Sequence, residues 1–259
     1  MAMYSSPAFG DVSLPNSLPE LLNFLYDAAD PTVFMWRGQS NADWPVHSGA
    51  FRRHLTDKNS PPSRSRLKSY ETYLLGKARH QGFDIIDGRR LCDLELLARL
   101  QHHGAATRLV DFTRSSLVAL YFACAENLSI TGALIRFHTN YLGGHEGEPD
   151  ETSYDDLEEV LQKMEYPATW QPTGVSPRIA AQRSQFLYSR ISDDPRGSLQ
   201  IDNAADSFQV IGISPYMKRT CLGFLRAACD IHRTSLFPDL DGFAGAHGVS
   251  TSVYGNERW

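Results

Sequence analysis

The chain has 259 residues, of which 42% are hydrophobic and 21% charged, and its net charge is −5. This length suffices for one large domain or two small ones with a real core. The acidic balance argues against binding to DNA or RNA by bulk charge alone, although a local basic groove stays open. Because no apolar run reaches the roughly 18 residues of a membrane span and the N-terminus does not resemble a secretory signal, we expect a cytoplasmic protein without membrane contact, with delivery into another cell left open.

Helical and extended patterns follow one another along the first half of the chain. Residues 1–15 predict no regular element and are interpreted as a lead-in to one domain over residues 16–259. Residues 17–30 predict a helix capped by Ser17, and residues 32–36 predict a strand that is apolar on both faces and therefore central in its sheet. Further helices are predicted at 67–78, 92–104 and 115–127, with a short extended stretch from 107.

The second half continues the mixture after an acidic segment punctuated by glycine and proline at 139–175. The patterns predict helices at 154–164 and 214–231, strands at 133–138, 184–189 and 207–213, and one more element from 235. There is no regular βαβ rhythm, which favours an α+β fold. The cysteines form no CxxC pair, so we interpret Cys92, Cys124, Cys221 and Cys229 as reduced thiols rather than a disulfide frame or a zinc site.

An arginine stands at the end of the apolar stretch 32–36, followed by Gly38 and Gln39. A guanidinium in that position must be paired or must face a cleft, because burying it alone is costly. One interpretation of Arg37 is a buried structural ion pair. The other is a clamp for phosphate or carboxylate, to which the planar guanidinium is suited, with the glycine allowing close approach.

A histidine pair, His102 and His103, ends the predicted helix 92–104. The helix dipole favours imidazolium there, but side chains of adjacent residues diverge, so we expect no metal site. Beyond the pair, Arg108 and Asp111 allow either a local ion pair that shapes the loop or a contact to phosphate.

Hydroxyl residues stand where the extended stretch meets the helix 115–127. Thr113, Ser115 and Ser116 are expected to cap that helix, or to present hydroxyls and main-chain N–H groups to a phosphate. Later in the chain, Arg178 and Gln182 lead into the strand 184–189, either as a polar strand entry or as groups at the mouth of a site. The sequence has no GxGxxG, GxxxxGK[ST], GxSxG or HExxH motif.

Several blocks together resemble one known family, the FRG domain, named for a Phe-Arg-Gly motif. These blocks are FMWRGQ, LARLQHHGAATRLVDFTRSSLVALYFA, PRIAAQRSQF and SLFPDLDG, spread from about Leu18 to Gly242, with Trp36 in place of the usual phenylalanine. The family's layout is in turn similar to that of ADP-ribosyltransferases. That likeness implies an α+β domain with a split mixed or antiparallel sheet, and NAD+ as the substrate from which ADP-ribose is transferred.

The resemblance also implies roles for particular residues. Catalytic roles fall to Arg37, Gln182 and His103, with Gln182 in the place of the usual glutamate, so that Asp111 or Glu95 would have to supply a carboxylate for an oxocarbenium-like ribose. The residues expected to bind NAD+ are Arg37, Gly38, Gln39, Arg108, Thr113, Ser115 and Ser116. The implied partners are a macromolecular target, protein or nucleic acid, and an antitoxin or immunity protein of a bacterial or phage effector.

Two other classes of function stay open at this stage. One is a nuclease or phosphodiesterase in which His102 or His103 is the general base and the arginines hold phosphate. The other is a module that binds a nucleotide or a protein without catalysis. An uncharged Gln182 in the place of a carboxylate favours this second class, because an amide donates and accepts hydrogen bonds but carries no charge.

Overall fold

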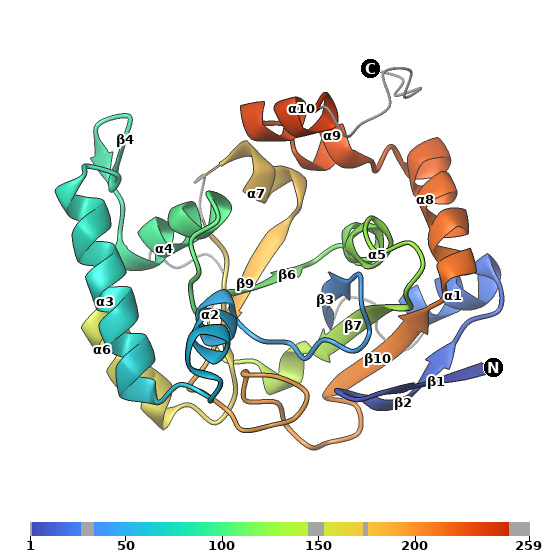
Figure 1. Cartoon of the computed structure of the whole chain (residues 1–259), viewed down its shortest axis with the longest axis horizontal. Helices are drawn as coiled ribbons and strands as arrows, with labels where there is room; N and C mark the ends of the chain where they lie inside the picture. Colours follow the sequence, from blue (N-terminus) through green and yellow to red (C-terminus); the bar gives the residue numbers. More distant parts are fainter. Residues whose placement is uncertain (1, 27–33, 145–152, 173–175, 249–259) are drawn as a thin grey trace.

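The computed structural model describes residues 2–26, 34–144, 153–172 and 176–248. They form a single α+β domain built on one mixed eight-stranded sheet of order β1-β2-β10-β7-β3-β6-β9-β8 (Figure 1). The strands in that order are β1 (Ala2–Ser6), β2 (Gly10–Leu14), β10 (Phe208–Ile213), β7 (Gly132–His138), β3 (Phe34–Gln39), β6 (Val110–Thr113), β9 (Ser184–Tyr188) and β8 (Ala168–Trp170). Only β2 and β10 pair in parallel; the other neighbours are antiparallel.

The pairing between β3 and β6, near the middle of the sheet, is short. β3 pairs with β7 along its whole length, whereas it meets β6 only where Trp36 lies opposite Thr113. Beyond that pair the two strands separate. The predicted split sheet is therefore one continuous sheet with a weak central junction.

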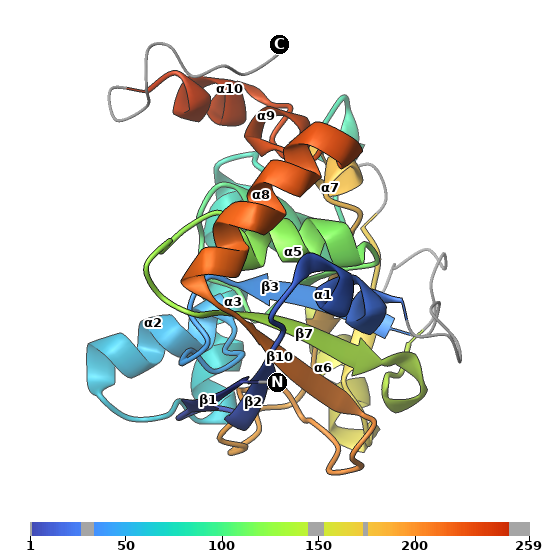
Figure 2. The ribbon, with the colours of Figure 1, turned by 90° about the vertical axis from the view of Figure 1, so that its right-hand side faces the viewer.

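Two groups of helices cover one face of the sheet, on either side of this junction. The first group packs on β3, β7 and β10 (Figure 2) and consists of α1 (Leu18–Leu25), α5 (Ser116–Cys124), α8 (Pro215–Cys229) and α9 (Arg233–Leu236). The second packs beside β8 and β9 and consists of α3 (Arg64–His80), α4 (Asp93–His102), α6 (Tyr154–Lys163) and α7 (Pro177–Ala181). A third apolar cluster, with Met35, Ile135, Phe137 and Leu187, lies on the opposite face. Each group thus has its own apolar core, and the junction lies between them.

Gly38 is required by the packing of α5 on β3. A Cβ atom at this position would lie 1.8 Å from the carbonyl oxygen of Ala119 and 2.5 Å from the nitrogen of Ala123. Such distances are far inside van der Waals contact, so only glycine lets the helix backbone approach the strand this closely. The close approach that the sequence predicted is therefore made by a helix.

Several elements differ from the sequence-based expectations. Residues 2–14, expected to be irregular, form the β1–β2 hairpin on the edge of the sheet, because a short hairpin gains its stability from the neighbouring strand rather than from its own composition. Arg37 lies inside β3 and not at its end, since the strand continues to Gln39. The predicted helix and strand residues 27–30 and 32–33 lie outside the described residues.

Other elements had no counterpart in the predictions. They are α2 (Gly49–Lys58), the small hairpin of β4 (Ile85–Ile86) and β5 (Arg89–Arg90), the 3-10 turn η1 (Thr139–Tyr141), β8, and α7 in place of a polar strand entry. The last predicted element is divided into α9 and α10 (Leu240–Ala246). The caps at Ser17 and Ser115 and the stop at Gly104, with φ +88°, are confirmed. All four cysteines are free thiols.

None of the helices in the described ranges combines the length and the apolar character needed to cross a membrane.

Candidate functional site

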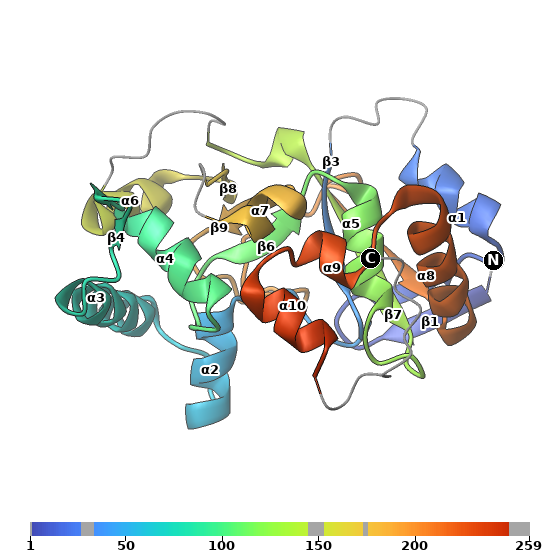
Figure 3. The same ribbon diagram turned by 90° about the horizontal axis from the view of Figure 1, so that it is seen from above.

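A cavity of about 310 Å³ lies over the β3–β6 junction, between the two groups of helices. Its floor comes from β3, β6 and β9, its walls from α4 and α5, and its rim from α7 and Phe237, the residue after α9. Figure 3 shows α7, α9 and α10 between α4 and α5. The volume is at the lower end of the roughly 300–1,000 Å³ typical of small-molecule sites. The polar side chains that line it are Arg37, Gln101, His102, Asp111, Thr113, Arg178, Gln182 and Ser184.

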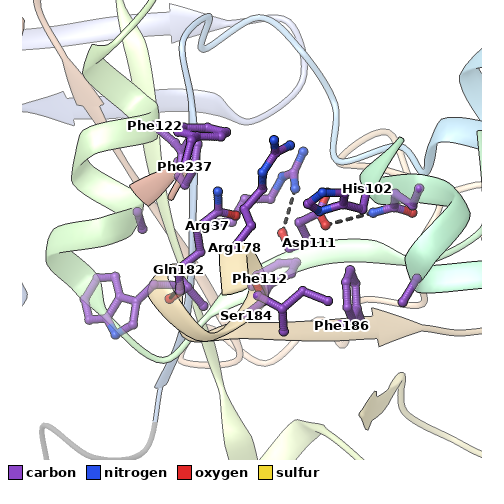
Figure 4. Close-up of a pocket in the computed structure, with 17 residues that line it drawn as sticks. Arg37, His102, Asp111, Phe112, Phe122, Arg178, Gln182, Ser184, Phe186 and Phe237 are labelled. Atoms are coloured by element: carbon purple, nitrogen blue, oxygen red, sulfur yellow. Dashed lines mark hydrogen bonds between the residues drawn. The ribbon is translucent and has the colours of Figure 1, made fainter. Parts of the chain in front are cut away.

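Arg37 reaches across the gap that opens where β3 leaves β6. Its Nη1 donates to the carbonyl oxygen of Asp111 over 2.6 Å (Figure 4). Its Nε donates to Oε1 of Gln39 over 3.1 Å. Both acceptors are neutral, and no carboxylate in the described part of the chain lies within ion-pair distance of the guanidinium. Burial lowers the pKa of Arg37 from its usual value, an effect that Asp111 opposes. The cavity therefore contains a cation whose charge is not neutralised by a direct partner.

Asp111 is the carboxylate of the cavity. Gln101 on α4 donates to its Oδ1 over 2.7 Å, and Thr107 in turn donates to the Gln101 side chain, so the carboxyl group is held in place. Surrounding protein desolvates the carboxyl and raises its pKa above the usual value, while Arg37 and the Gln101 hydrogen bond act in the opposite direction. Its side chain is nevertheless open to the cavity. Asp111 is thus a held but reachable carboxyl near a cation.

Thr113 ties the floor of the cavity to α7 and α5. Its hydroxyl donates to the main-chain carbonyl of Gln182 over 2.8 Å and accepts from the main-chain N–H of Ser115 over 3.0 Å. The side-chain amide of Gln182 donates to the carbonyl of Leu236 at the end of α9, over 3.1 Å. Thr113 and Gln182 therefore both line the cavity, and their hydrogen bonds connect β6 with the starts of α5 and β9 and with the end of α9.

Arg178 and His102 form the rim together with Asp239. Arg178 makes two hydrogen bonds of 2.7 Å to the two carboxylate oxygens of Asp239, a bidentate pair. Nε2 of His102 lies 3.4 Å from Oδ2 of Asp239, and Nδ1 lies 3.4 Å from the hydroxyl of Ser176. Both nitrogens of His102 thus have partners, and the charge of Arg178 is already paired.

Arg108 lies outside the cavity in a sealed ionic network. Its Nε donates to Glu71 over 3.0 Å, and its Nη2 contacts both Glu158 and the hydroxyl of Tyr154. Burial alone would lower the pKa of Arg108, but Glu71, Tyr154 and Glu158 outweigh it and raise the value. Arg108 therefore forms ion pairs with α3 and α6 and is not available to bind a phosphate.

The remaining expected site residues do not line the cavity. Ser115 caps α5 by accepting from the N–H of Val118, and Ser116 begins that helix. His103 is exposed and faces Asp241 of α10, with Nδ1 3.9 Å from Oδ2. Glu95 accepts from Arg89 and caps α4 at its far end. Gln39 contributes by holding Arg37.

Several residues that shape the site had no role expected from the sequence. Phe122 on α5 and Phe237 after α9 form an edge-to-face pair with ring centroids 6.0 Å apart, and Figure 4 shows them together beside Arg37 and Arg178. Gln101 and Asp239 position the polar groups. Both Gln101 and Phe237 fall within blocks of the family resemblance, which was the only signal for them in the sequence.

The fold and the site together define an α+β domain with a polar cavity over a weak sheet junction. Comparison with protein families finds one similarity: residues 32–131 match the family model of the FRG domain. The match contains Arg37, Gln101, Asp111 and Thr113 but ends before α7 and α9, which complete the cavity. Comparisons with curated proteins and with solved structures gave no match.

Proposed function

We propose that the cavity binds NAD+ and that the chain transfers ADP-ribose from NAD+ to a macromolecular target. The observation that carries this proposal is the presence of Arg37 and Asp111 in one cavity, the first with an unpaired charge and the second held by Gln101. A dinucleotide offers a pyrophosphate for the arginine and ribose hydroxyls for the carboxylate. No other pair in the described residues of the cavity offers both a free cation and a free carboxyl, since Arg178 and Asp239 neutralise each other.

In the proposed reaction, different residues of the cavity perform different tasks. The bond between the nicotinamide nitrogen and C1′ of its ribose breaks, nicotinamide leaves with the bonding electrons, and the ribose passes through an oxocarbenium-like state that a nucleophile of the target attacks. Asp111 supplies the negative charge that stabilises this cation, the task for which Gln182 is unsuited. Phe122 and Phe237 provide an apolar wall for the nicotinamide ring.

The size of the cavity supports binding of the reacting half of NAD+. A volume of about 310 Å³ suits a nucleoside, so the nicotinamide ribose lies inside and the adenosine extends through the mouth. Arg37 at the junction then meets the pyrophosphate between the two halves. Surrounding desolvation strengthens each of these electrostatic contacts relative to water.

The geometry disfavours the nuclease alternative. A general base needs a free nitrogen within reach of the substrate, whereas both nitrogens of His102 have partners and His103 faces Asp241 on the outside. Arg108, the expected second phosphate contact, is sealed by Glu71 and Glu158.

The test is release of nicotinamide from NAD+, with and without bacterial lysate. Wild-type protein should release nicotinamide and label lysate macromolecules, while Arg37→Ala and Asp111→Asn should lose both activities. Arg99→Ala is the matched control, because Arg99 is also half-buried and donates to main-chain carbonyls, yet lies outside the cavity. Binding of NAD+ without release would indicate a binding module instead, and absence of both binding and release would exclude NAD+.

A further inference from the structure

A group of metal-binding side chains lies at the C-terminal end of α4, on the outer rim of the cavity. His102 and His103 end that helix, and Asp241 stands in the first turn of α10. One ligand atom from each of the three lies within 4.8 Å of the other two. The imidazole rings of the two histidines are edge-to-face with centroids 4.8 Å apart, so the side chains of this adjacent pair do converge, contrary to the expectation from their spacing.

We propose that His102, His103 and Asp241 bind a divalent transition-metal ion of the zinc class. Two imidazoles and one carboxylate form a ligand set that suits Zn²⁺, Co²⁺ or Ni²⁺, whereas Mg²⁺ and Ca²⁺ prefer oxygen ligands alone. Three protein ligands leave at least one coordination position for water or for a group of a bound molecule. This site is independent of the proposed reaction on NAD+.

The distances require only small side-chain movements for binding. An ion at the centre of three atoms within 4.8 Å of one another lies no more than about 2.8 Å from each, against roughly 2.0–2.2 Å for zinc bonds. The side chains of His103 and Asp241 are 60% and 68% exposed, so they are free to close this difference. Rotation about their side-chain torsions is sufficient.

Two features of the surroundings favour a cation at this place. The C-terminal end of α4 carries the negative end of the helix dipole, which stabilises positive charge. The carboxylate of Asp239 lies 3.4 Å from Nε2 of His102 and the hydroxyl of Ser176 lies 3.4 Å from Nδ1, so the ion takes the place of one of these two contacts. Asp239 is itself fixed by Arg178 on α7. The bound ion would therefore join α4 to α10, both of which are already linked through Asp239.

The test is titration of the full-length protein, freed of metal by a chelator, with Zn²⁺ and separately with Co²⁺. Wild-type protein should bind one ion of each, with a Co²⁺ absorption spectrum showing nitrogen ligands and a rise in Tm. His103→Ala and Asp241→Asn should each weaken Zn²⁺ binding by at least about 10-fold. Because both side chains are exposed, the variants should keep the wild-type circular dichroism and metal-free Tm.

His80→Ala is the matched control, because His80 is also an exposed histidine at the end of a helix, α3, but has no second histidine beside it. It should bind Zn²⁺ as wild type does. Equal Zn²⁺ affinity of wild type, His103→Ala and Asp241→Asn would overturn the proposal, as would the absence of a Co²⁺ spectrum with nitrogen ligands. Loss of binding in the His80→Ala variant would also overturn it.

Discussion

Arg37 and Arg108, both of which were expected from the sequence to contact phosphate, occupy opposite environments in the structure. Arg108 is enclosed by Glu71, Glu158 and Tyr154, and every charge around it has a partner. Among the described residues, Arg37 donates to a main-chain carbonyl and an amide and to no carboxylate, while Asp111 remains open to the cavity. A fully paired buried network holds elements together, whereas charges left without partners in a cavity are available to a ligand. The difference separates a structural arginine from a candidate functional one.

The largest expected effect is the loss of stability when Arg108 is removed. Arg108→Met leaves Glu71 and Glu158 buried with an uncompensated charge, which should lower the free energy of unfolding by about 3–5 kcal/mol. Urea denaturation measures this value. Arg64→Ala is the control, because Arg64 also contacts Glu158 but is half exposed, and it should cost less than about 1 kcal/mol. Equal losses of stability in the two variants would contradict the difference expected between the buried ion pairs of Arg108 and the half-exposed ion pair of Arg64.

Gly38→Ala tests the packing of α5 on β3 next to Arg37. The new methyl group would collide with the main chain of α5 at Ala119, so the helix must move and stability should fall by about 1–3 kcal/mol. Thermal unfolding measures the loss. Gly76→Ala on α3 is the control, since a Cβ at Gly76 meets nothing within 4 Å and should not destabilise the protein. An unchanged Tm for Gly38→Ala would contradict the described packing.

Arg37→Ala should change stability little, by less than about 1 kcal/mol, because in the described part of the chain the guanidinium pairs with no carboxylate and is partly desolvated. The same substitution should weaken NAD+ binding by at least about 10-fold, since it removes a charged hydrogen-bond donor. Urea denaturation and equilibrium binding give the two values. A large loss of stability without a loss of binding would make Arg37 a second structural arginine like Arg108.

The smallest expected effect is a gain in stability from Asp111→Asn. Because desolvation by the surrounding protein raises the pKa of this carboxyl, the folded chain holds the proton more tightly than the unfolded chain, and stability falls as pH rises from about 4 through the folded pKa. Asparagine does not ionise, so the variant should have a Tm up to about 2 °C higher at pH 7, with the difference vanishing near pH 4. A lower Tm at pH 7 would show that the ionised carboxyl stabilises the fold.

Much of the fold was readable from local patterns, and the strongest signals were the most reliable. The apolar helix after Ser115 and the strand at 133–138 were predicted correctly, because their patterns are long and their start signals clear. The β1–β2 hairpin and β8 were missed because they depend on pairing with strands distant in the sequence. Local residue types carry no information about such neighbours.

The candidate site was predictable only in part. Arg37, Thr113 and Gln182, to which the resemblance gave roles, line one cavity together with Asp111. The role of Arg108 could not be read locally, because its partners Glu71 and Glu158 lie far away along the chain. The same holds for Asp241, which meets His103 only because α10 folds back over α4. Contacts of this kind are set by the tertiary arrangement.

The most direct measurement of the central claim is calorimetric titration of NAD+ into wild-type protein and into Arg37→Ala and Arg99→Ala variants. We expect one NAD+ bound per chain, a loss of affinity of at least about 10-fold in Arg37→Ala, and wild-type affinity in Arg99→Ala. Equal affinity in all three proteins, or no binding by wild type, would contradict the assignment of the Arg37–Asp111 cavity to NAD+.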